Sequence, residues 1–168
     1  MINFICKLIV LLVLLFLYIP FSYSQEDVMN LKGLDKVLFS VDWLGNVYPA
    51  EINIDTDSTF EKVTMILELA PEVIDARGVT NNPEHTPALV ISVDLESVGT
   101  DYIYYAIKLE LVEYVELGRL GTRSCRAITW ERIKYDLYQK SNAGEQLESA
   151  LYDLADIFVK DYYADNPE

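Results

Sequence analysis

The sequence of 168 residues has few of the residues that build most catalytic and metal centres. It contains one histidine, His85, and two cysteines, Cys6 and Cys125. A single histidine excludes zinc sites built on paired histidines and leaves a histidine-based nucleophile system without its parts. Glycine-rich phosphate loops, a nucleophile elbow and a Cys-x-x-Cys pair are also missing. The sequence therefore predicts no cofactor, and it favours a protein that is not an enzyme.

Long hydrophobic runs are absent except near the start. Residues 8–19 form an unbroken apolar run that Pro20 ends, and Ser22 and Ser24 are small residues at positions −3 and −1 of a cleavage site. This arrangement is typical of a secretory signal peptide at 1–24. The alternative is an uncleaved anchor, but the run is short for a membrane span of ~20 residues. We predict a secreted or periplasmic protein with a single domain at 25–168 and no stable membrane span after signal cleavage.

Positive charge is also scarce, with 13 basic against 27 acidic residues. Removing the leader takes away Lys7 and no acid, so the formal charge becomes −15. Such a surface repels nucleic-acid phosphates and anionic lipid head groups, so neither is an expected partner.

Only one cysteine, Cys125, remains after the leader, and no internal disulfide is expected. Its thiol is either activated by Arg123 and Arg126 or simply a small buried apolar group.

Alternating apolar residues predict four long strands, at 37–43, 89–96, 102–117 and from 126 to about 138. The third is the one that the chain is organised around. Its apolar face carries Ile103, Tyr105, Ile107, Leu109, Leu111, Val115 and Leu117. Residues 97–101 contain Gly99 and form a turn of hairpin length, so the second and third strands should be antiparallel neighbours.

Two amphipathic helices are expected. An apolar stripe from Phe60 to Ile74 follows a capping box formed by Ser58 and Glu61, and Pro71 should kink or divide this helix. A second helix runs from a capping box at Asn142 and Glu145 to about 166. Residues 48–54 are predicted as an extended connection or a short edge strand.

This order of elements predicts an α+β fold. It is a two-layer sandwich in which a mainly antiparallel sheet of about four strands carries the two amphipathic helices on one face. The helices would cover the apolar face of the strand at 102–117.

The other face of that strand suggests a binding surface. Tyr102, Tyr104 and Tyr114 lie on it, and Trp130 follows on the next strand, so together they could form an aromatic platform for a peptide, a glycan or a partner protein. The alternative is that these are ordinary half-buried sheet residues beneath the helices.

Two further segments carry side chains that could bind a metal ion or titrate. Asp55, Asp57 and Glu61 place carboxylates at alternate positions, as calcium loops do, but the glycine of an EF-hand loop is absent and helix capping explains these residues without a metal. His85, beside Glu84, is either a titrating loop residue or ordinary surface. No metal is therefore predicted, with calcium at Asp55, Asp57 and Glu61 as the weaker alternative.

Some segments suggest a family. Residues 31–34 (LKGL), 127–130 (AITW) and 154–167 (LADIFVKDYYADNP) resemble those of a loosely defined group of small exported bacterial proteins of uncharacterised function. The element order is also similar to that of envelope accessory domains, such as the N-terminal domain of TolB and the curli and penicillin-binding-protein accessory lipoproteins. This chain lacks the lipid-anchor cysteine that many such proteins carry after the leader.

These observations favour an exported, non-enzymatic accessory or interaction domain of the bacterial cell envelope, with another envelope protein as its partner. The alternative is a small-ligand-binding or hydrolytic domain that uses carboxylates and tyrosines in a cleft.

Overall fold

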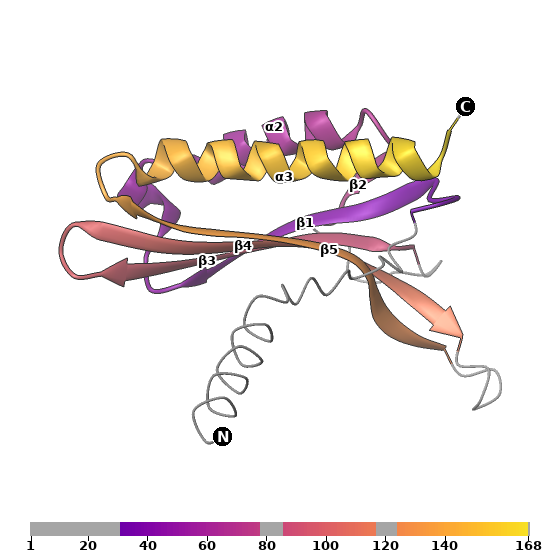
Figure 1. Cartoon of the computed structure of the whole chain (residues 1–168), viewed down its shortest axis with the longest axis horizontal. Helices are drawn as coiled ribbons and strands as arrows, with labels where there is room; N and C mark the ends of the chain where they lie inside the picture. Colours follow the sequence, from indigo (N-terminus) through magenta and orange to yellow (C-terminus); the bar gives the residue numbers. More distant parts are fainter. Residues whose placement is uncertain (1–30, 78–85, 117–123, 168) are drawn as a thin grey trace, which may run out of the picture.

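The computed structural model describes residues 31–77, 86–116 and 124–167 (Figure 1). The predicted signal peptide, residues 1–24, and His85 lie outside these ranges. The elements are β1 (Lys36–Gly45), the short 3-10 helix η1 (Pro49–Ile52), α2 (Thr56–Leu67), β2 (Glu72–Asp75), β3 (Ala88–Val98), β4 (Tyr102–Glu116), β5 (Ser124–Gln139) and α3 (Ala143–Asp165).

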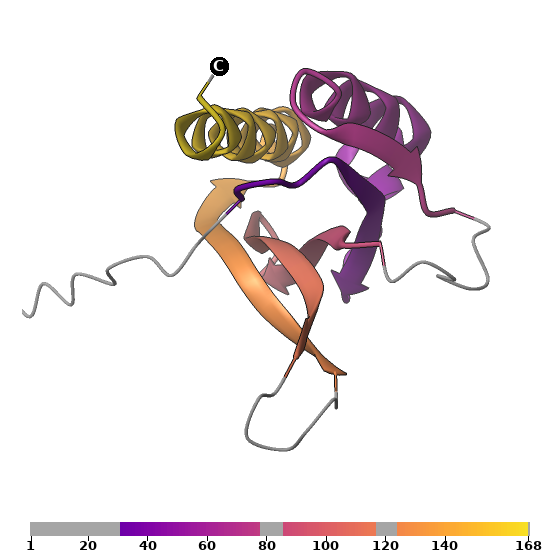
Figure 2. The same cartoon turned by 90° about the vertical axis from the view of Figure 1, so that its right-hand side faces the viewer.

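The predicted α+β sandwich is confirmed, with a richer sheet. Five strands lie in the order β2-β1-β3-β4-β5 rather than the expected four. β1 runs parallel to both β2 and β3, whereas β3 with β4 and β4 with β5 are antiparallel, so the sheet is mixed rather than mainly antiparallel as predicted. Figure 2 shows α2 and α3 side by side on one face of the sheet, and the other face carries no helix of the described chain.

The unexpected strand comes from the segment predicted as the end of the first helix. α2 ends at Leu67, and Glu72–Asp75 form β2, with Ile74 opposite Leu38 of β1. Pro71 divides the two elements because proline has no N–H to continue a helix. Val73 and Ile74 keep the helical spacing of the preceding stripe, which is why the sequence predicts one helix here.

The predicted helix caps are wrong in detail. The N-cap of α2 is Asp55, whose Oδ1 accepts hydrogen bonds from the N–H groups of Asp57 (3.1 Å) and Ser58 (3.2 Å). Asn142 precedes α3 but its side chain makes no capping hydrogen bond. Residues 49–52, predicted as extended, form η1 instead.

We expect Asp55→Ala to lower the free energy of unfolding by about 1 kcal/mol, because two N–H groups at the start of α2 lose their acceptor. The matched control is Ser58→Ala, which removes a side chain that caps nothing and should leave stability within about 0.5 kcal/mol. Urea unfolding followed by circular dichroism measures both. Equal losses for the two variants would contradict the assignment of the cap.

The apolar face of β4 lies at the centre of the core, as predicted. Ile103, Tyr105, Ile107, Leu109 and Leu111 are each no more than 1% exposed. The buried residues that the two helices contribute to this layer are Phe60, Val63 and Leu67 from α2 and Ala143, Leu147, Ala150, Leu151, Leu154, Ala155 and Phe158 from α3. The Thr59 hydroxyl donates to Glu148 (2.9 Å), which also ties α2 to α3.

The two ends of the described domain are hydrogen-bonded to each other. The Leu31 N–H donates to Asp165 and the Gly33 N–H to the side-chain oxygen of Asn166, both at 2.8 Å. The Asn166 amide donates in return to the Leu31 carbonyl (2.9 Å). Two of the segments that carry the family resemblance, 31–34 and 154–167, are therefore in contact, and these hydrogen bonds give them a structural role.

Candidate functional site

A β-bulge decides which side chains of β5 face away from the helices. Leu111 of β4 lies opposite Trp130, but Val112 lies opposite Ile128, so Thr129 is an extra residue in β5. An extra residue reverses the alternation of faces along a strand. Ile128 is therefore 54% exposed whereas Trp130 is 1% exposed, although their spacing of two predicts the same face.

Trp130 does not belong to the predicted aromatic platform. Its ring packs edge-on against Phe158 of α3 with centroids 5.2 Å apart, and its indole N–H donates to Asp161 (3.1 Å). The same Asp161 carboxylate pairs with Arg132 at 2.7 Å. Trp130 is thus a core residue that fixes β5 to α3, and the expectation that it lies with the tyrosines is wrong.

Tyr102 and Tyr104 do lie on the helix-free face, where three residues of β5 join them. Tyr104 is opposite Leu137, Ala106 is opposite Tyr135, and Lys108 is opposite Ile133. We call Tyr102, Tyr104, Ile133, Tyr135 and Leu137 the β4–β5 patch. Tyr135, Ile133 and Leu137 are 69%, 56% and 47% exposed, so three large apolar side chains face solvent on one strand.

Tyr114, the remaining residue of the predicted platform, lies apart from the patch. It is opposite Arg126, beyond the bulge, where β4 and β5 continue together away from the two layers (Figures 1 and 2). It is also exposed, at 40%. The structure therefore brings together two of the four predicted platform residues and adds three residues of β5 that were not predicted.

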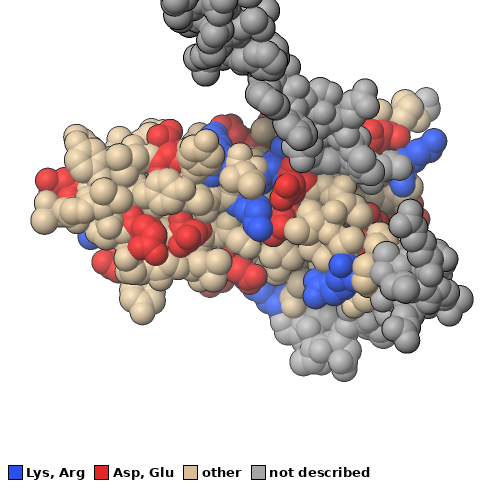
Figure 3. Space-filling model, turned by 60° about the horizontal axis from the view of Figure 1, so that its bottom comes forward, with Lys and Arg blue, Asp and Glu red and all other residues tan. Residues whose placement is uncertain are grey.

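Charged residues surround the β4–β5 patch. Asp94 and Glu96 of β3 lie opposite Ala106 and Tyr104. At the bulge end Glu110 faces Glu131, and Lys108 offsets this like-charge pair by an ion pair with Glu110 (3.0 Å). Figure 3 shows the side away from the helices, where large areas without charge alternate with acidic groups and fewer basic ones. The patch is thus an apolar strip with a mainly acidic rim.

The helix side of β5 is held by an ion pair and by an aromatic contact. Lys134 pairs with Asp153 (2.7 Å), and Tyr138 stacks on Tyr105 with ring centroids 5.6 Å apart. Burial raises the pKa of Tyr105 far above that of a free tyrosine. These contacts position β5 beneath α3 and leave the opposite side chains of β5 facing solvent.

A groove of about 370 Å³ lies between β5 and α3. The residues that line it are Arg132, Ile133, Lys134, Asp153, Leu154, Asp156, Ile157 and Lys160. Arg132 and Lys134 have carboxylate partners in Asp161 and Asp153, and no tyrosine lines this groove. A second hollow, of about 450 Å³, is formed by residues 100–102 and 139–141 and includes Asp101 and Tyr102.

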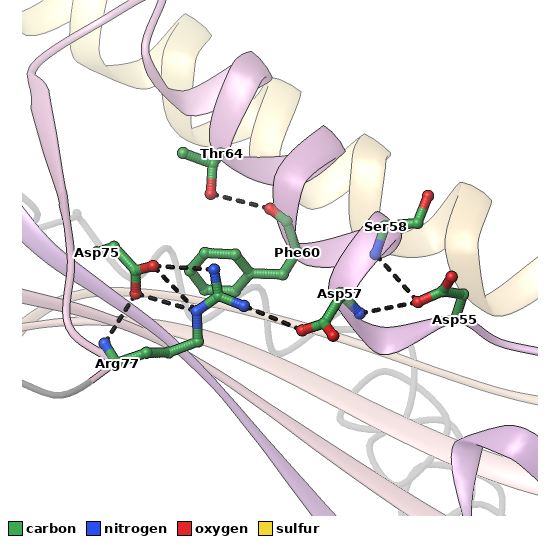
Figure 4. A network of polar contacts seen from close by, with 7 residues as sticks. All are labelled: Asp55, Asp57, Ser58, Phe60, Thr64, Asp75 and Arg77. Carbon is green, nitrogen blue, oxygen red and sulfur yellow. Dashed lines mark hydrogen bonds and ion pairs between the residues drawn. The ribbon is translucent and has the colours of Figure 1, made fainter.

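Two of the three carboxylates considered for calcium, those of Asp55 and Asp57, have other partners. Asp55 caps α2, and Asp57 accepts a hydrogen bond from Arg77 (3.1 Å), whose guanidinium also binds both oxygens of Asp75 (Figure 4). The guanidinium carbon lies 3.7 Å from the centre of the Phe60 ring. Within the described ranges, no group of three or more His, Cys, Asp or Glu side chains is arranged to hold a metal ion.

Arg77 lowers the pKa of Asp75 through its side-chain hydrogen bonds. A lowered folded-state pKa adds stability above the ordinary carboxyl pKa of about 3.9, and this contribution is lost as the pH falls through the folded-state value. We expect an NMR titration to show that Arg77→Gln raises the pKa of Asp75 back toward its ordinary value. An unchanged titration curve would contradict the pairing shown in Figure 4.

Cys125 is a free thiol, half-buried on β5 opposite Val115.

Neither α2 nor α3, the two α-helices of the described ranges, combines the length and hydropathy that a bilayer crossing requires.

No protein-family model and no curated protein matches the chain. Among solved structures, the chain is similar to the crystal structure of a minor lipoprotein from Acinetobacter baumannii. The two are 10% identical, the match covers 76% of this chain and 88% of that chain, and the TM-score is 0.25. The family resemblance remains a prediction.

Proposed function

We propose that the chain is an exported, non-enzymatic interaction domain of the bacterial cell envelope. It binds a partner protein through the β4–β5 patch on the helix-free face of its sheet. The partner presents an apolar surface with a basic rim, because the patch is apolar, its rim is mainly acidic, and the chain after residue 24 carries a formal charge of −15. Export rests on the predicted signal peptide.

The exposure of Ile133, Tyr135 and Leu137 is the observation that carries this proposal. Exposed apolar side chains are common singly, but three on alternate positions of one strand, beside Tyr102 and Tyr104, form a continuous patch. Large aromatic side chains with a polar end contribute strongly to protein interfaces. The sheet does not need these side chains for its core, which lies on the opposite face.

A hydrolytic or small-ligand function has less support. The groove between β5 and α3 contains Asp153 and Asp156, but Lys134 pairs with Asp153, and Lys160 pairs with Asp156 at 3.7 Å. Both carboxylates therefore already have a lysine partner, which suits a structural role better than acid–base chemistry.

Affinity capture from envelope fractions tests the proposal. The bait is the exported chain with Tyr135→Ser and Leu137→Ser, compared with the unaltered chain. The control pair is Met65→Ser and Leu69→Ser, which removes two apolar side chains that are at least as exposed, near the opposite surface on and after α2. We expect the patch variant to lose a partner at least about tenfold and the control to retain it. Equal recovery with both baits would exclude the patch as the binding surface.

A further inference from the structure

The two edges of the sheet differ greatly in length. β2, at one edge, has 4 residues, whereas β5, at the other, has 16 and contains neither proline nor glycine. No strand of the described chain pairs with the outer side of β5. A long edge strand with exposed apolar side chains is a template for another strand, and short edge strands are one way in which proteins avoid such pairing. β5 lacks that protection.

The outward-facing backbone groups of β5 can be identified from the register. The Lys140 N–H donates to the Asp101 carbonyl (2.8 Å), just past the paired residues Gln139 and Tyr102. Since hydrogen bonding alternates along antiparallel strands, the even-numbered residues of β5 bond β4 and the odd-numbered residues from 131 to 139 point outward. In agreement, the Leu137 N–H has a side-chain acceptor, the Asp136 carboxylate, at 2.8 Å.

The outward edge is also accessible beneath α3. The groove between β5 and α3 is lined by residues 132–134 of the strand, so the helix leaves this part of the edge open. The side chains near the edge on the helix side are charged, with the basic Arg132 and Lys134 followed by the acidic Asp136. On the other side stand Ile133, Tyr135 and Leu137 of the patch.

We propose that β5 pairs antiparallel with β5 of a second copy of this chain, about a two-fold axis at Tyr135. This register places Lys134 opposite Asp136 of the partner copy twice and sets Ile133 against Leu137, so charges and apolar groups both match. An axis at Lys134 or Asp136 would place each of those charges opposite itself. An axis at Ile133 would place Arg132 of one copy opposite Lys134 of the other. An axis at Leu137 would place Lys134 opposite Lys140. Both registers bring like charges together.

Pairing would also change the hydrogen bonding of Leu137. Its N–H would donate to the Ile133 carbonyl of the second copy, and the Asp136 carboxylate would become available to the second copy's Lys134. The two sheets would then form one continuous ten-stranded sheet, and the two β4–β5 patches would lie side by side on its helix-free face. The dimer requires no other protein, so it stands independently of the envelope partner proposed above.

Analytical ultracentrifugation of the chain expressed from its full sequence, and of two charge variants, tests the dimer. We expect the unaltered chain to sediment as a dimer at micromolar concentration. Asp136→Lys places Lys opposite Lys134, and Lys134→Glu places Glu opposite Asp136, so each variant alone should raise the dimer dissociation constant at least about tenfold. A mixture of the two restores both charge pairs and should form a heterodimer.

The mixing experiment distinguishes pairing from a loss of folding. Lys134→Glu also removes the ion pair with Asp153, so circular dichroism and urea unfolding must show that each variant is folded. Failure of the folded variants to associate on mixing would overturn the register. A monomeric unaltered chain would overturn the dimer and would leave the envelope-partner proposal untouched.

Discussion

Trp130→Ala is expected to lower the free energy of unfolding by about 3–5 kcal/mol, the largest effect of any single substitution considered. The indole fills the space between β5 and α3, stacks edge-on against Phe158 and donates to Asp161. Its removal leaves a large cavity and takes one partner from a half-buried carboxylate that Arg132 also binds. Urea unfolding followed by circular dichroism measures the loss.

Ile128→Ala is the matched control, two residues away on the same strand. Because Thr129 is an extra residue, Ile128 faces solvent on the helix-free side, and its truncation should change stability by no more than about 0.5 kcal/mol. Similar losses for both variants would mean that the two side chains share a face, which would contradict the bulge and with it the position of the β4–β5 patch.

Gly45→Ala is expected to cost about 3 kcal/mol. Gly45 ends β1 with φ +91°, and a Cβ there would lie 2.1 Å from the Leu95 carbonyl oxygen. That oxygen also accepts the N–H groups of Asn46 and Val47, so β1 and β3 cannot separate without losing hydrogen bonds. A left-handed residue other than glycine costs about 1–2 kcal/mol, and overpacking adds about 1–3 kcal/mol.

Gly99→Ala separates these two costs. Gly99 also has a positive φ, +65°, but a Cβ there would meet no atom within 4 Å. This variant should lose only the conformational part, about 1 kcal/mol, in the same unfolding experiment. If both glycine variants were equally stable, the close approach of β1 to the Leu95 carbonyl would be wrong.

The sequence predicted the long elements because their patterns are regular. β4 has one uninterrupted apolar face from Ile103 to Leu111, and the structure buries it as expected. β2 was missed because it has four residues and its apolar pair, Val73 and Ile74, continues the helical spacing of α2. Short strands depend on pairing with a distant strand, which local spacing does not reveal.

The candidate site was predicted in part for a related reason. Tyr102 and Tyr104 were placed on the correct face because the alternation of β4 holds over that range. The alternation of β5 reverses at Thr129, so a pattern counted from Arg126 has the wrong phase beyond the bulge. Beyond the bulge, apolar and charged residues alternate along β5. Ile133, Tyr135 and Leu137 lie between Arg132, Lys134 and Asp136. This short pattern, taken by itself, indicates an apolar strip on one face.

Site-specific photo-crosslinking in the cells that produce the chain tests the role of the β4–β5 patch most directly. A benzophenone amino acid replaces Tyr135 in the patch or, as the control, Met65 on α2, which is equally exposed at 69%. We expect the probe at position 135 to form a defined crosslinked product, either with an envelope protein or, at twice the mass of the chain, with a second copy. The probe at position 65 should form neither product. Identical crosslinking patterns at the two positions, or none at position 135, would contradict a binding role for this face.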